Sequence, residues 1–192
     1  MIEDKQLVER ALAGSQDAYR EIVDRYQRPI YSLVIRMVRD PSAAEELSQD
    51  VFCKAFRALS SFDSTRKFSS WLFKIAHNAA IDQLRRRRVP TVSLENEDTE
   101  RDDPLRSYAD PNAENPEEYF RRQELGVAIE SSLAGLRPEY REILVLRFEQ
   151  EKSYEEISEI VDLPLGTVKT HLHRARKALA GALGKKGWYP GK

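Results

Sequence analysis

Apolar residues recur at every third or fourth position through nearly every patterned segment of this 192-residue chain. That spacing places them on one face of an α-helix, whereas a half-buried β-strand would alternate apolar and polar residues. Strand-like alternation is absent throughout, so the sequence predicts an all-α protein. Gly, Pro and Asp interrupt the apolar stripes, and the helices are expected to end at those interruptions.

The charge of the chain is unevenly distributed, although its formal net charge is only −1. Residues 1–90 hold 16 basic and 12 acidic side chains, whereas residues 91–123 hold 4 basic and 10 acidic ones. Residues 124–192 hold 11 basic and 10 acidic side chains. Two blocks of positive balance are therefore separated by an acidic block, and the near-neutral total conceals this pattern.

The acidic block has the composition of a linker. From about residue 90 to residue 116 there is no periodicity, and Asp, Glu, Asn, Ser and Pro dominate. This stretch could fold over a basic surface or remain a solvated tether. We predict two small helical domains joined by an acidic flexible linker: 1–90 for the first domain, 91–118 for the linker, 119–187 for the second domain and 188–192 for a tail.

The first domain should consist of several helices with defined interruptions. Pro29 is expected to interrupt or bend one of them, and Asp40-Pro41 should end it. Ser42 is a suitable N-cap for the next helix. Cys53 lies within the apolar pattern of that helix and is predicted to be a small buried residue. Since it is the one cysteine, an intramolecular disulfide is excluded.

The segment 153–183 predicts two helices joined by a tight turn. Ser153 is a good N-cap, and Glu156 three residues later completes a capping-box pattern. Asp162, Pro164 and Gly166 then supply turn chemistry. Thr167 or Gly166 is expected to begin the second helix. The pattern is typical of a helix-turn-helix, although an ordinary solvated helical hairpin would look similar.

The second helix of this hairpin is strongly basic on its outer side. Val168, Leu172, Ala175 and Leu179 form the inward stripe. From Pro164 onward there are seven Lys or Arg residues and no Asp or Glu. Such a surface suits phosphate contacts and base edges in the major groove of DNA. The candidate DNA-binding residues are Lys169, Thr170, His173, Arg174, Arg176 and Lys177.

A second basic segment, FSSWLFKIAHNAAIDQLRRRR from Phe68, interleaves cations with aromatic residues. Aromatic rings stack on unpaired bases and a positive groove holds the backbone, so this segment favours single-stranded nucleic acid. We expect Trp71 to be a core residue and the polar edge to make the contacts. With the preceding loop 62–66, the candidates are Phe62, Asp63, Ser64, Arg66, Lys74, His77, Asn78, Asp82, Arg85 and Arg86.

The helix before that loop has a different character. Glu46, Gln49 and Asp50 give it an acidic, amide-bearing surface, which suits docking to a positively charged protein rather than to DNA. An ordinary solvated helix face is the alternative.

No catalytic constellation and no metal site is predicted, and no cofactor is expected. There is no Gly-rich phosphate loop and no Ser/His/Asp or Cys/His arrangement. His171 and His173 are two residues apart on a helix and point in different directions, so they cannot share a metal ion. The N-terminus carries no apolar signal segment, and no apolar run reaches the length of a membrane span. We expect a non-enzymatic, cytoplasmic protein without membrane insertion.

Taken in order, these blocks resemble the extracytoplasmic-function group of bacterial sigma-70 factors. The first matching blocks are AEELSQDVFCKAFRAL from Ala44 and the segment from Phe68. The last is LRPEYREILVLRFEQEKSYEEISEIVDLPLGTVKTHLHRARKAL from Leu136. The resemblance covers nearly the whole chain. It implies an alternative sigma factor that binds core RNA polymerase and directs promoter-specific initiation, without a small-molecule substrate.

The resemblance also implies roles for the candidate residues. Glu46, Gln49 and Asp50 would contact the clamp helices of the polymerase β′ subunit, and the β flap would be a further contact with the polymerase. Loop 62–66 and the basic helix after it would recognise the −10 element and hold a flipped base, while the helix-turn-helix would recognise the −35 element. The acidic linker would run toward the RNA-exit path. An anti-sigma factor is the expected inhibitor.

Two other classes of protein are compatible with parts of the pattern. A response-regulator-type DNA-binding protein would share the helix-turn-helix, but the N-terminal half lacks βα alternation and a phosphoacceptor pocket. An RNA- or single-strand-binding adaptor would use only the arginine run at residues 85–88. An enzyme is a more distant alternative.

Overall fold

The computed structural model describes residues 3–88 and 116–188, called here the N-terminal half and the C-terminal half. Both consist of helices and turns, and no strand occurs in either described range. The N-terminal half contains α1 (Asp4–Leu12), α2 (Gln16–Val38), α3 (Pro41–Ala58), the short 3₁₀ helix η1 (Leu59–Ser61) and α4 (Phe68–Arg88). The predicted all-α class is confirmed.

The C-terminal half begins with two helices that precede the helix-turn-helix. Its elements are α5 (Pro116–Ala134), α6 (Pro138–Leu144), the π-helical turn η2 (Val145–Glu149), α7 (Tyr154–Val161) and α8 (Leu165–Lys185). Pro138 occupies the first turn of α6, where its missing N–H has no helical partner to lose. Most of the predicted linker lies outside the described residues.

Local capping sets the helix boundaries in the N-terminal half. The Ser15 side chain accepts a hydrogen bond from the Ala18 N–H at the start of α2. The N-cap of α3 is Asp40, whose carboxylate accepts from the Ala43 N–H, and Pro41 occupies the first turn. The prediction of Ser42 as the cap was wrong, because Asp40 is already in extended conformation and Pro41 is preorganised for the first helical position.

Pro29 lies inside α2 and does not end it. A proline removes one backbone hydrogen bond and strains the preceding turn. The residues after it compensate by packing inward: Ile30, Leu33 and Val34 have no exposed surface. The apolar stripe therefore continues across the proline, and α2 is one helix of 23 residues.

The turn of the helix-turn-helix depends on one left-handed residue. Asp162 ends α7 with φ of 56°, a conformation that Asp tolerates better than most residues. The predicted capping box is confirmed, since Ser153 accepts from the Glu156 N–H and Glu156 accepts from the Ser153 N–H. The N-cap of α8 is Pro164 rather than Thr167 or Gly166. Because α8 starts at Leu165, both of those residues lie within its first turn.

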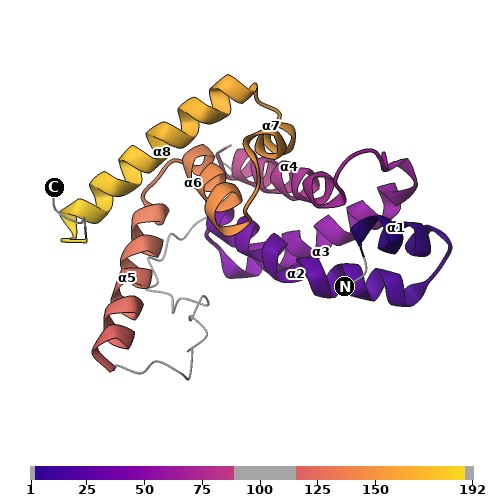
Figure 1. The fold of residues 1–192 in the computed structure, drawn as a ribbon, viewed down its shortest axis with the longest axis horizontal. Helices are drawn as coiled ribbons and strands as arrows, with labels where there is room; N and C mark the ends of the chain where they lie inside the picture. The colour runs from indigo at the N-terminus through magenta and orange to yellow at the C-terminus, as the bar shows by residue number, and fades with distance from the viewer. Residues whose placement is uncertain (1–2, 89–115, 189–192) are drawn as a thin grey trace.

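The two halves pack against each other along α4 (Figure 1). Helices α1 to α4 form one bundle, α7 packs on α4, and α6 packs on α2. Helix α8 crosses α6 and α7 and runs away from the N-terminal bundle toward α5. Buried residues from both halves form one continuous hydrophobic cluster that reaches from Leu7 to Ala175. The predicted domains therefore lie in direct contact in this structure.

Candidate nucleic-acid and protein interfaces

The first candidate surface is the outer face of α8. Burial of Val168, Leu172 and Ala175 fixes how the helix is rotated about its axis. As a result, all six predicted DNA contacts are exposed on the other side: Lys169, Thr170, His173, Arg174, Arg176 and Lys177. Four of these six carry a fixed positive charge, and α8 contains no acidic residue. The arrangement presents a positive helical surface of the kind that fits a major groove.

Two polar side chains of α8 are engaged within the protein. The Thr170 hydroxyl donates to the Gly166 carbonyl at 2.9 Å. His171 is half-buried, and its ring lies 5.6 Å from the ring of Tyr140 in an edge-to-face arrangement. His173 is exposed. The two histidines therefore occupy different environments, in keeping with the prediction that they point apart.

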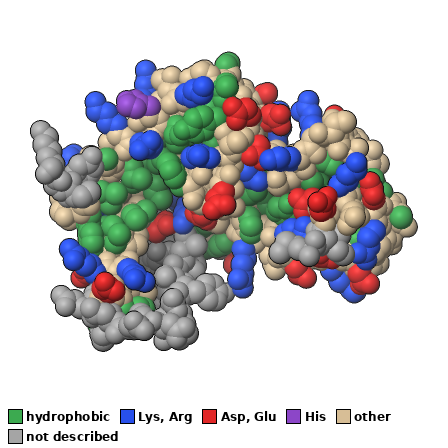
Figure 2. Space-filling model, viewed as in Figure 1, with side chains coloured by type: hydrophobic (Ala, Val, Ile, Leu, Met, Phe, Trp, Pro, Cys, Tyr) green, Lys and Arg blue, Asp and Glu red, His purple; other side chains and the backbone are tan. Residues whose placement is uncertain are grey.

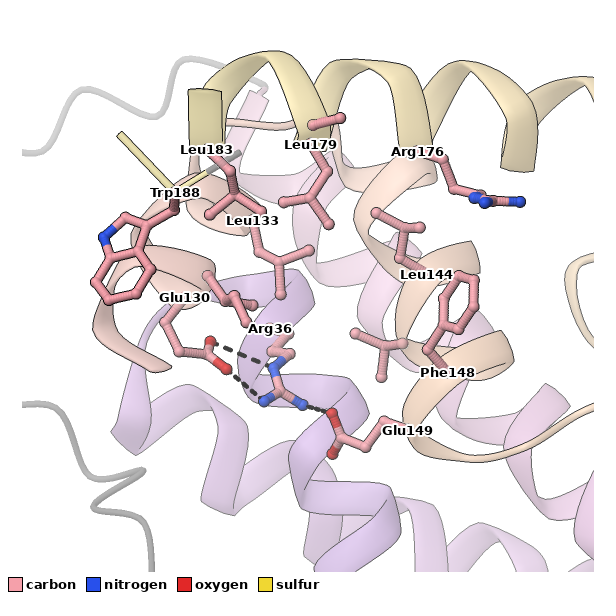
Figure 3. Close-up of a pocket in the computed structure, with 13 residues that line it drawn as sticks. Arg36, Glu130, Leu133, Leu144, Phe148, Glu149, Arg176, Leu179, Leu183 and Trp188 are labelled. Carbon is pink, nitrogen blue, oxygen red and sulfur yellow. Dashed lines mark hydrogen bonds and ion pairs between the residues drawn. The ribbon is translucent and has the colours of Figure 1, made fainter. Parts of the chain in front are cut away.

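Arg176 lies at the edge of this exposed face, beside Lys169 and His173 by helical spacing. It also lines a groove between α8 and the helices beneath it, together with Leu144 and Leu179 (Figure 3). Arg176 is therefore exposed like its basic neighbours and borders the groove as well.

The second candidate surface is on α4, where four of the six predicted contacts are exposed. Asn78, Asp82, Arg85 and Arg86 are exposed. Asp82 and Arg85 form only a long ion pair of 3.8 Å between well-exposed groups. Exposed pairs of this kind contribute little to stability, so both side chains are free to exchange partners.

Lys74 and His77 of the same helix instead contact the C-terminal half. His77 Nδ1 lies 2.6 Å from the Glu142 carboxylate, and the two side chains are 14% and 3% exposed. Lys74 Nζ lies 3.4 Å from the Asp162 carboxylate, in a more exposed pair. These predicted DNA contacts are thus occupied by carboxylates of the other half.

The loop before α4 is partly built into the core. The Phe62 ring packs 5.6 Å from Phe68 and 5.2 Å from Trp71. Phe68 is buried and Trp71 is half-buried against the core, as we expected for Trp71. In this structure Phe62 therefore anchors the loop to the core by packing on Phe68 and Trp71.

The polar tip of this loop has its own hydrogen bonds. Asp63 accepts from the backbone N–H of Thr65 at 2.9 Å and from its hydroxyl at 2.7 Å. These hydrogen bonds lower the pKa of Asp63 below its usual value. Ser64 and Arg66 are exposed, and Arg66 lies 3.7 Å from Asp63. The tip is therefore a preformed turn with an ionised carboxylate and a cation at its surface.

The third candidate surface is the outer face of α3. Glu46, Gln49 and Asp50 are all exposed and lie on adjacent turns, while Val51 behind them is fully buried. Cys53 is exposed on the next turn of the same face. The prediction that Cys53 is buried was wrong, because Val51, Phe52 and Ala55 fill the inner side of the helix and Cys53 falls outside that stripe.

An apolar groove of 610 Å³ lies between α5, α6, η2 and α8. Figure 2 shows apolar side chains gathered on the surface over this part of the C-terminal half. Phe148 stands at its edge with 61% of its surface exposed. The apolar residues that line it are Ile129, Leu133, Leu144, Val145, Phe148, Leu179, Ala180, Leu183 and Trp188.

Charged residues of both halves meet at the end of this groove (Figure 3). The Arg36 guanidinium from α2 forms ion pairs with Glu130 of α5, at 2.5 Å, and with Glu149 of η2. Arg36 is only 13% exposed. Glu149 also accepts from the Ser32 hydroxyl. The groove is thus bounded by an ion-pair network that joins the N-terminal half to the C-terminal half.

Arg141 is a further link between the halves. Its side chain is buried and donates to the backbone carbonyls of Arg36, Ala134 and Leu136. Burial lowers the pKa of Arg141 to about 10, so it remains protonated at neutral pH.

Sequence reasoning missed both the groove and this network. The apolar stripes were visible in the sequence, but whether a stripe is covered depends on helices that are distant along the chain. The sequence contained only a weak indication that Arg141 is buried. Arg141 adjoins the apolar residues of α6, but an arginine at that position would ordinarily be expected to be exposed.

Within residues 3–88 and 116–188, no group of three or more His, Cys, Asp and Glu side chains is arranged to hold a metal ion. Across the same ranges, none of the helices has both the length and the apolar character needed to cross a bilayer.

Comparison with protein families matches both halves. Residues 22–89 match the model described as Sigma-70 region 2, and residues 126–179 match the model described as Sigma-70, region 4. The ECF RNA polymerase sigma factor SigW of Bacillus subtilis (strain 168) is 38% identical over 177 residues, which cover 91% of this chain and 94% of the relative. The ECF RNA polymerase sigma-E factor of Escherichia coli (strain K12) is 37% identical, with 92% of both chains covered.

Solved structures share the arrangement of helices. CnrH, solved in complex with the cytosolic domain of CnrY, superposes with a TM-score of 0.68 and 25% sequence identity, covering 95% of this chain and 97% of CnrH. The sigma factor RpoE of Bartonella quintana, solved with the anti-sigma factor NepR, has a TM-score of 0.63 and covers 86% of this chain and 96% of RpoE. At 21% identity, the RpoE likeness concerns the fold alone.

Proposed function

The chain belongs to the extracytoplasmic-function sigma factors of the sigma-70 family, and from this premise we propose which of its surfaces bind promoter DNA and which bind core RNA polymerase. Sigma factors are not enzymes: they bind core polymerase and direct it to promoters to initiate transcription. Two DNA-binding surfaces in one chain fit that task, because a promoter presents two separate elements.

The outer face of α8 recognises the −35 element in duplex DNA. The observation that carries this assignment is the single row of exposed polar and basic residues above a fully buried stripe. Lys169, His173 and Arg174 would reach base edges, and Lys177 would contact phosphate. Arg176 is better suited to the groove edge, so we assign it a secondary role at most.

The surface around Asn78 recognises the −10 element and holds its separated strand. Asp82, Arg85 and Arg86 are exposed beside Asn78. The preformed turn at Asp63 would supply the loop next to them. Capturing an unstacked base repays the few kcal/mol that unstacking costs. Lys74 and His77 would join this surface once they are released from the C-terminal half.

The acidic face of α3 docks on a basic surface of the polymerase β′ clamp helices. Glu46, Gln49 and Asp50 are exposed, and none forms a hydrogen bond or an ion pair with another described residue. Their groups are therefore available to a partner, and opposite charge would steer the encounter.

The apolar groove accepts an amphipathic helix of the polymerase β flap. Its lining includes Arg176 but none of the other five predicted DNA contacts of α8, so an occupant would leave most of the −35 surface free. That geometry favours a partner that must be present while DNA is bound, which is the polymerase itself. We further propose that an anti-sigma factor inhibits the protein by covering these polymerase-binding surfaces, and that the protein acts in the cytoplasm with the polymerase.

Run-off transcription with purified core polymerase tests the function. Genomic DNA fragments would be transcribed with and without the protein, and the 5′ ends of the transcripts mapped. We expect a defined set of transcripts that require the protein. Transcripts that are unchanged by its addition would refute a sigma function.

A variant pair tests the groove. Phe148→Ala should weaken binding to core polymerase because Phe148 is an exposed ring at the groove edge. Phe120→Ala is the matched control, since Phe120 is equally exposed on α5 but lies outside the lining. Affinity for core would be measured by fluorescence anisotropy. Equal effects of the two substitutions would exclude the groove as the flap site, and loss of anti-sigma binding alone would assign it to the inhibitor.

A further inference from the structure

We propose that a second groove, between the end of α5 and the C-terminal part of α8, binds a small organic diphosphate such as a nucleoside diphosphate. The groove has a volume of 450 Å³ and shares no lining residue with the apolar groove beside Phe148. It is formed where α5 and α8 pack against each other (Figure 1).

Three lysines give this groove its charge. Lys177 and Lys185 line it from α8, and Lys186 follows directly at the end of that helix. None of the described residues that line the groove is acidic. Lys177 and Lys185 are about 12 Å apart along the helix axis. That spacing suits two linked phosphates better than a single ion, because each phosphate can engage a separate cation.

A buried hydroxyl without a partner lies in the same groove. Ser132 is among the lining residues, with only 3% of its surface exposed. Its Oγ has no hydrogen-bond partner among the described residues. The hydroxyl of the neighbouring Ser131, by contrast, donates to the Val127 carbonyl at 2.8 Å and accepts from Lys186. An unpaired buried hydroxyl is costly, so a ligand oxygen that accepts from Ser132 would remove that cost.

The end of α5 does not repel an anion from the groove. The last carbonyls of a helix carry partial negative charge, and Ala134 is the last residue of α5. Its carbonyl accepts hydrogen bonds from Arg39 at 3.3 Å and from Arg141 at 3.2 Å. The two guanidinium groups offset the negative charge, so the lysines determine the sign of the potential in the groove.

Small residues leave room for more than the phosphates. Gly135, Ala178, Gly181 and Ala182 line the groove beside Leu136. A Cβ atom added at Gly181 would meet no atom within 4 Å, so the space above it is open. The volume of 450 Å³ is within the range of small-molecule sites and exceeds what two phosphates would fill. A ring packed on these small residues would occupy the rest, which favours an organic diphosphate.

The DNA backbone is another source of phosphate for these lysines, but Ser132 argues against it. A rigid duplex on the exposed face of α8 could reach Lys177, whereas a hydroxyl buried between two helices is accessible only to a small ligand. Because Lys177 also belongs to the proposed −35 surface, a bound diphosphate would withdraw one cation from DNA and add negative charge beside it. This competition rests on the proposed function, whereas the binding site itself does not.

Nuclear magnetic resonance titration of the isotope-labelled full-length protein tests the site, with ADP, inorganic pyrophosphate and adenosine as probes. We expect ADP to shift the amide signals of Gly135 and Gly181 saturably, and adenosine to leave them unchanged. Replacing both Lys185 and Lys186 by Gln should weaken ADP binding about tenfold. The matched control replaces Lys5 and Lys54 by Gln, since both are exposed on the N-terminal half and lie outside the lining. It should change the affinity less than about twofold.

Two further variants separate ligand binding from folding. Ser132→Ala should weaken ADP binding about fivefold. It should leave the melting temperature unchanged or raise it, because the hydroxyl that it removes has no partner among the described residues. Gly181→Leu adds a side chain where the structure has open space and leaves the charge unchanged. It should weaken the binding of ADP more than that of pyrophosphate.

Each other outcome overturns a defined part of the proposal. No saturable shift with ADP or pyrophosphate at about 10 mM would refute the site. Equal losses in the two double-lysine variants would show non-specific attraction instead. Shifts caused by a scrambled duplex but by neither small probe would assign the groove to the DNA backbone. Equal effects of Gly181→Leu on ADP and pyrophosphate would exclude the organic part of the ligand.

The competition with DNA has its own readout. ADP should lower the affinity for a −35 duplex in the wild type and have less effect in Ser132→Ala. Saturable ADP binding that depends on Ser132, together with an unchanged affinity for the duplex, would support the site and refute only the competition.

Discussion

Helices α4 and α8 are both 21 residues long and both carry predicted DNA contacts, yet they differ in what covers them. On α8, all six predicted contacts are exposed. On α4, Lys74 and His77 are paired with carboxylates of the other half. The comparison teaches that a basic helical pattern indicates a DNA-binding surface, whereas the availability of that surface depends on residues far along the chain.

The largest expected effect concerns the packing of α6 on α2. Arg141→Ala would leave the carbonyls of Arg36, Ala134 and Leu136 without their buried donor. We expect a loss of about 3 kcal/mol in the free energy of unfolding, measured by urea denaturation. The exposed Arg137→Ala is the control and should change stability by less than about 0.5 kcal/mol. If only a separate transition of the C-terminal half shifts, the halves do not share a cooperative core.

The next effect concerns the open surface of α8. Arg174→Ala should weaken binding of the holoenzyme to a −35 guanine by roughly 1–3 kcal/mol if the contact is bidentate. Arg176→Ala, at the groove edge, should have a smaller effect. Binding would be compared on promoter and scrambled duplexes. Equal loss on both would show that Arg174 contacts only phosphate.

The acidic face of α3, to which we assign no DNA contact, gives a third comparison. Reversing Glu46 and Asp50 to Lys should weaken binding to core polymerase by about 1 kcal/mol per side chain and leave binding to an isolated −35 duplex unchanged. Asp24→Lys, on the exposed side of α2, is the matched reversal. Titration calorimetry with core polymerase measures the difference. Unchanged affinity for core would remove α3 from the docking surface.

The smallest effect concerns the helix that supports α8. Ser153→Ala should destabilise the fold by about 1 kcal/mol because it removes half of the capping box of α7. Ser42→Ala should be close to neutral, since Asp40 caps α3 instead. Thermal melting of the two variants would reveal the difference. Equal melting temperatures would mean that the α7 cap is energetically unimportant.

Acidification should weaken the same cap. Burial opposes ionisation of Glu156, but hydrogen bonds from the Ser153 N–H and Lys67 outweigh it and lower the pKa of Glu156. Because the pKa is lower in the folded state than in the unfolded state, this contribution is present at neutral pH and is lost as the pH falls through the acidic range. Glu156→Gln should flatten that part of the stability profile.

Local features of the fold were predictable from the sequence, and features set by distant contacts were not. The capping box at Ser153 and the start of α6 at Pro138 follow from residues within one turn. The starts of α3 and α8 were misassigned because two capping candidates stood close together, and the backbone conformation selected Asp40 and Pro164. Cys53 was misassigned because it adjoins the apolar stripe without belonging to it.

The candidate interfaces likewise contain some features that local spacing predicts and others that depend on distant contacts. Exposure of the row on α8 followed from helical spacing, since an inward stripe implies an outward face. The pairing of His77 with Glu142 joins residues that are 65 positions apart. No periodicity within either helix contains that information, and the groove beside Phe148 likewise arises only when α5, α6 and α8 come together.

The hydrogen bond from Thr170 to the Gly166 carbonyl has a consequence for the base recognition that we propose for α8. With its hydrogen already donated inside the helix, the hydroxyl is left with an accepting lone pair, and the side chain presents a methyl group. Such a side chain favours the 5-methyl of thymine or an amino group of adenine or cytosine over the acceptor edge of guanine. If α8 binds the −35 element as we propose, its backbone would thereby restrict the promoter sequences that the neighbouring cations can stabilise.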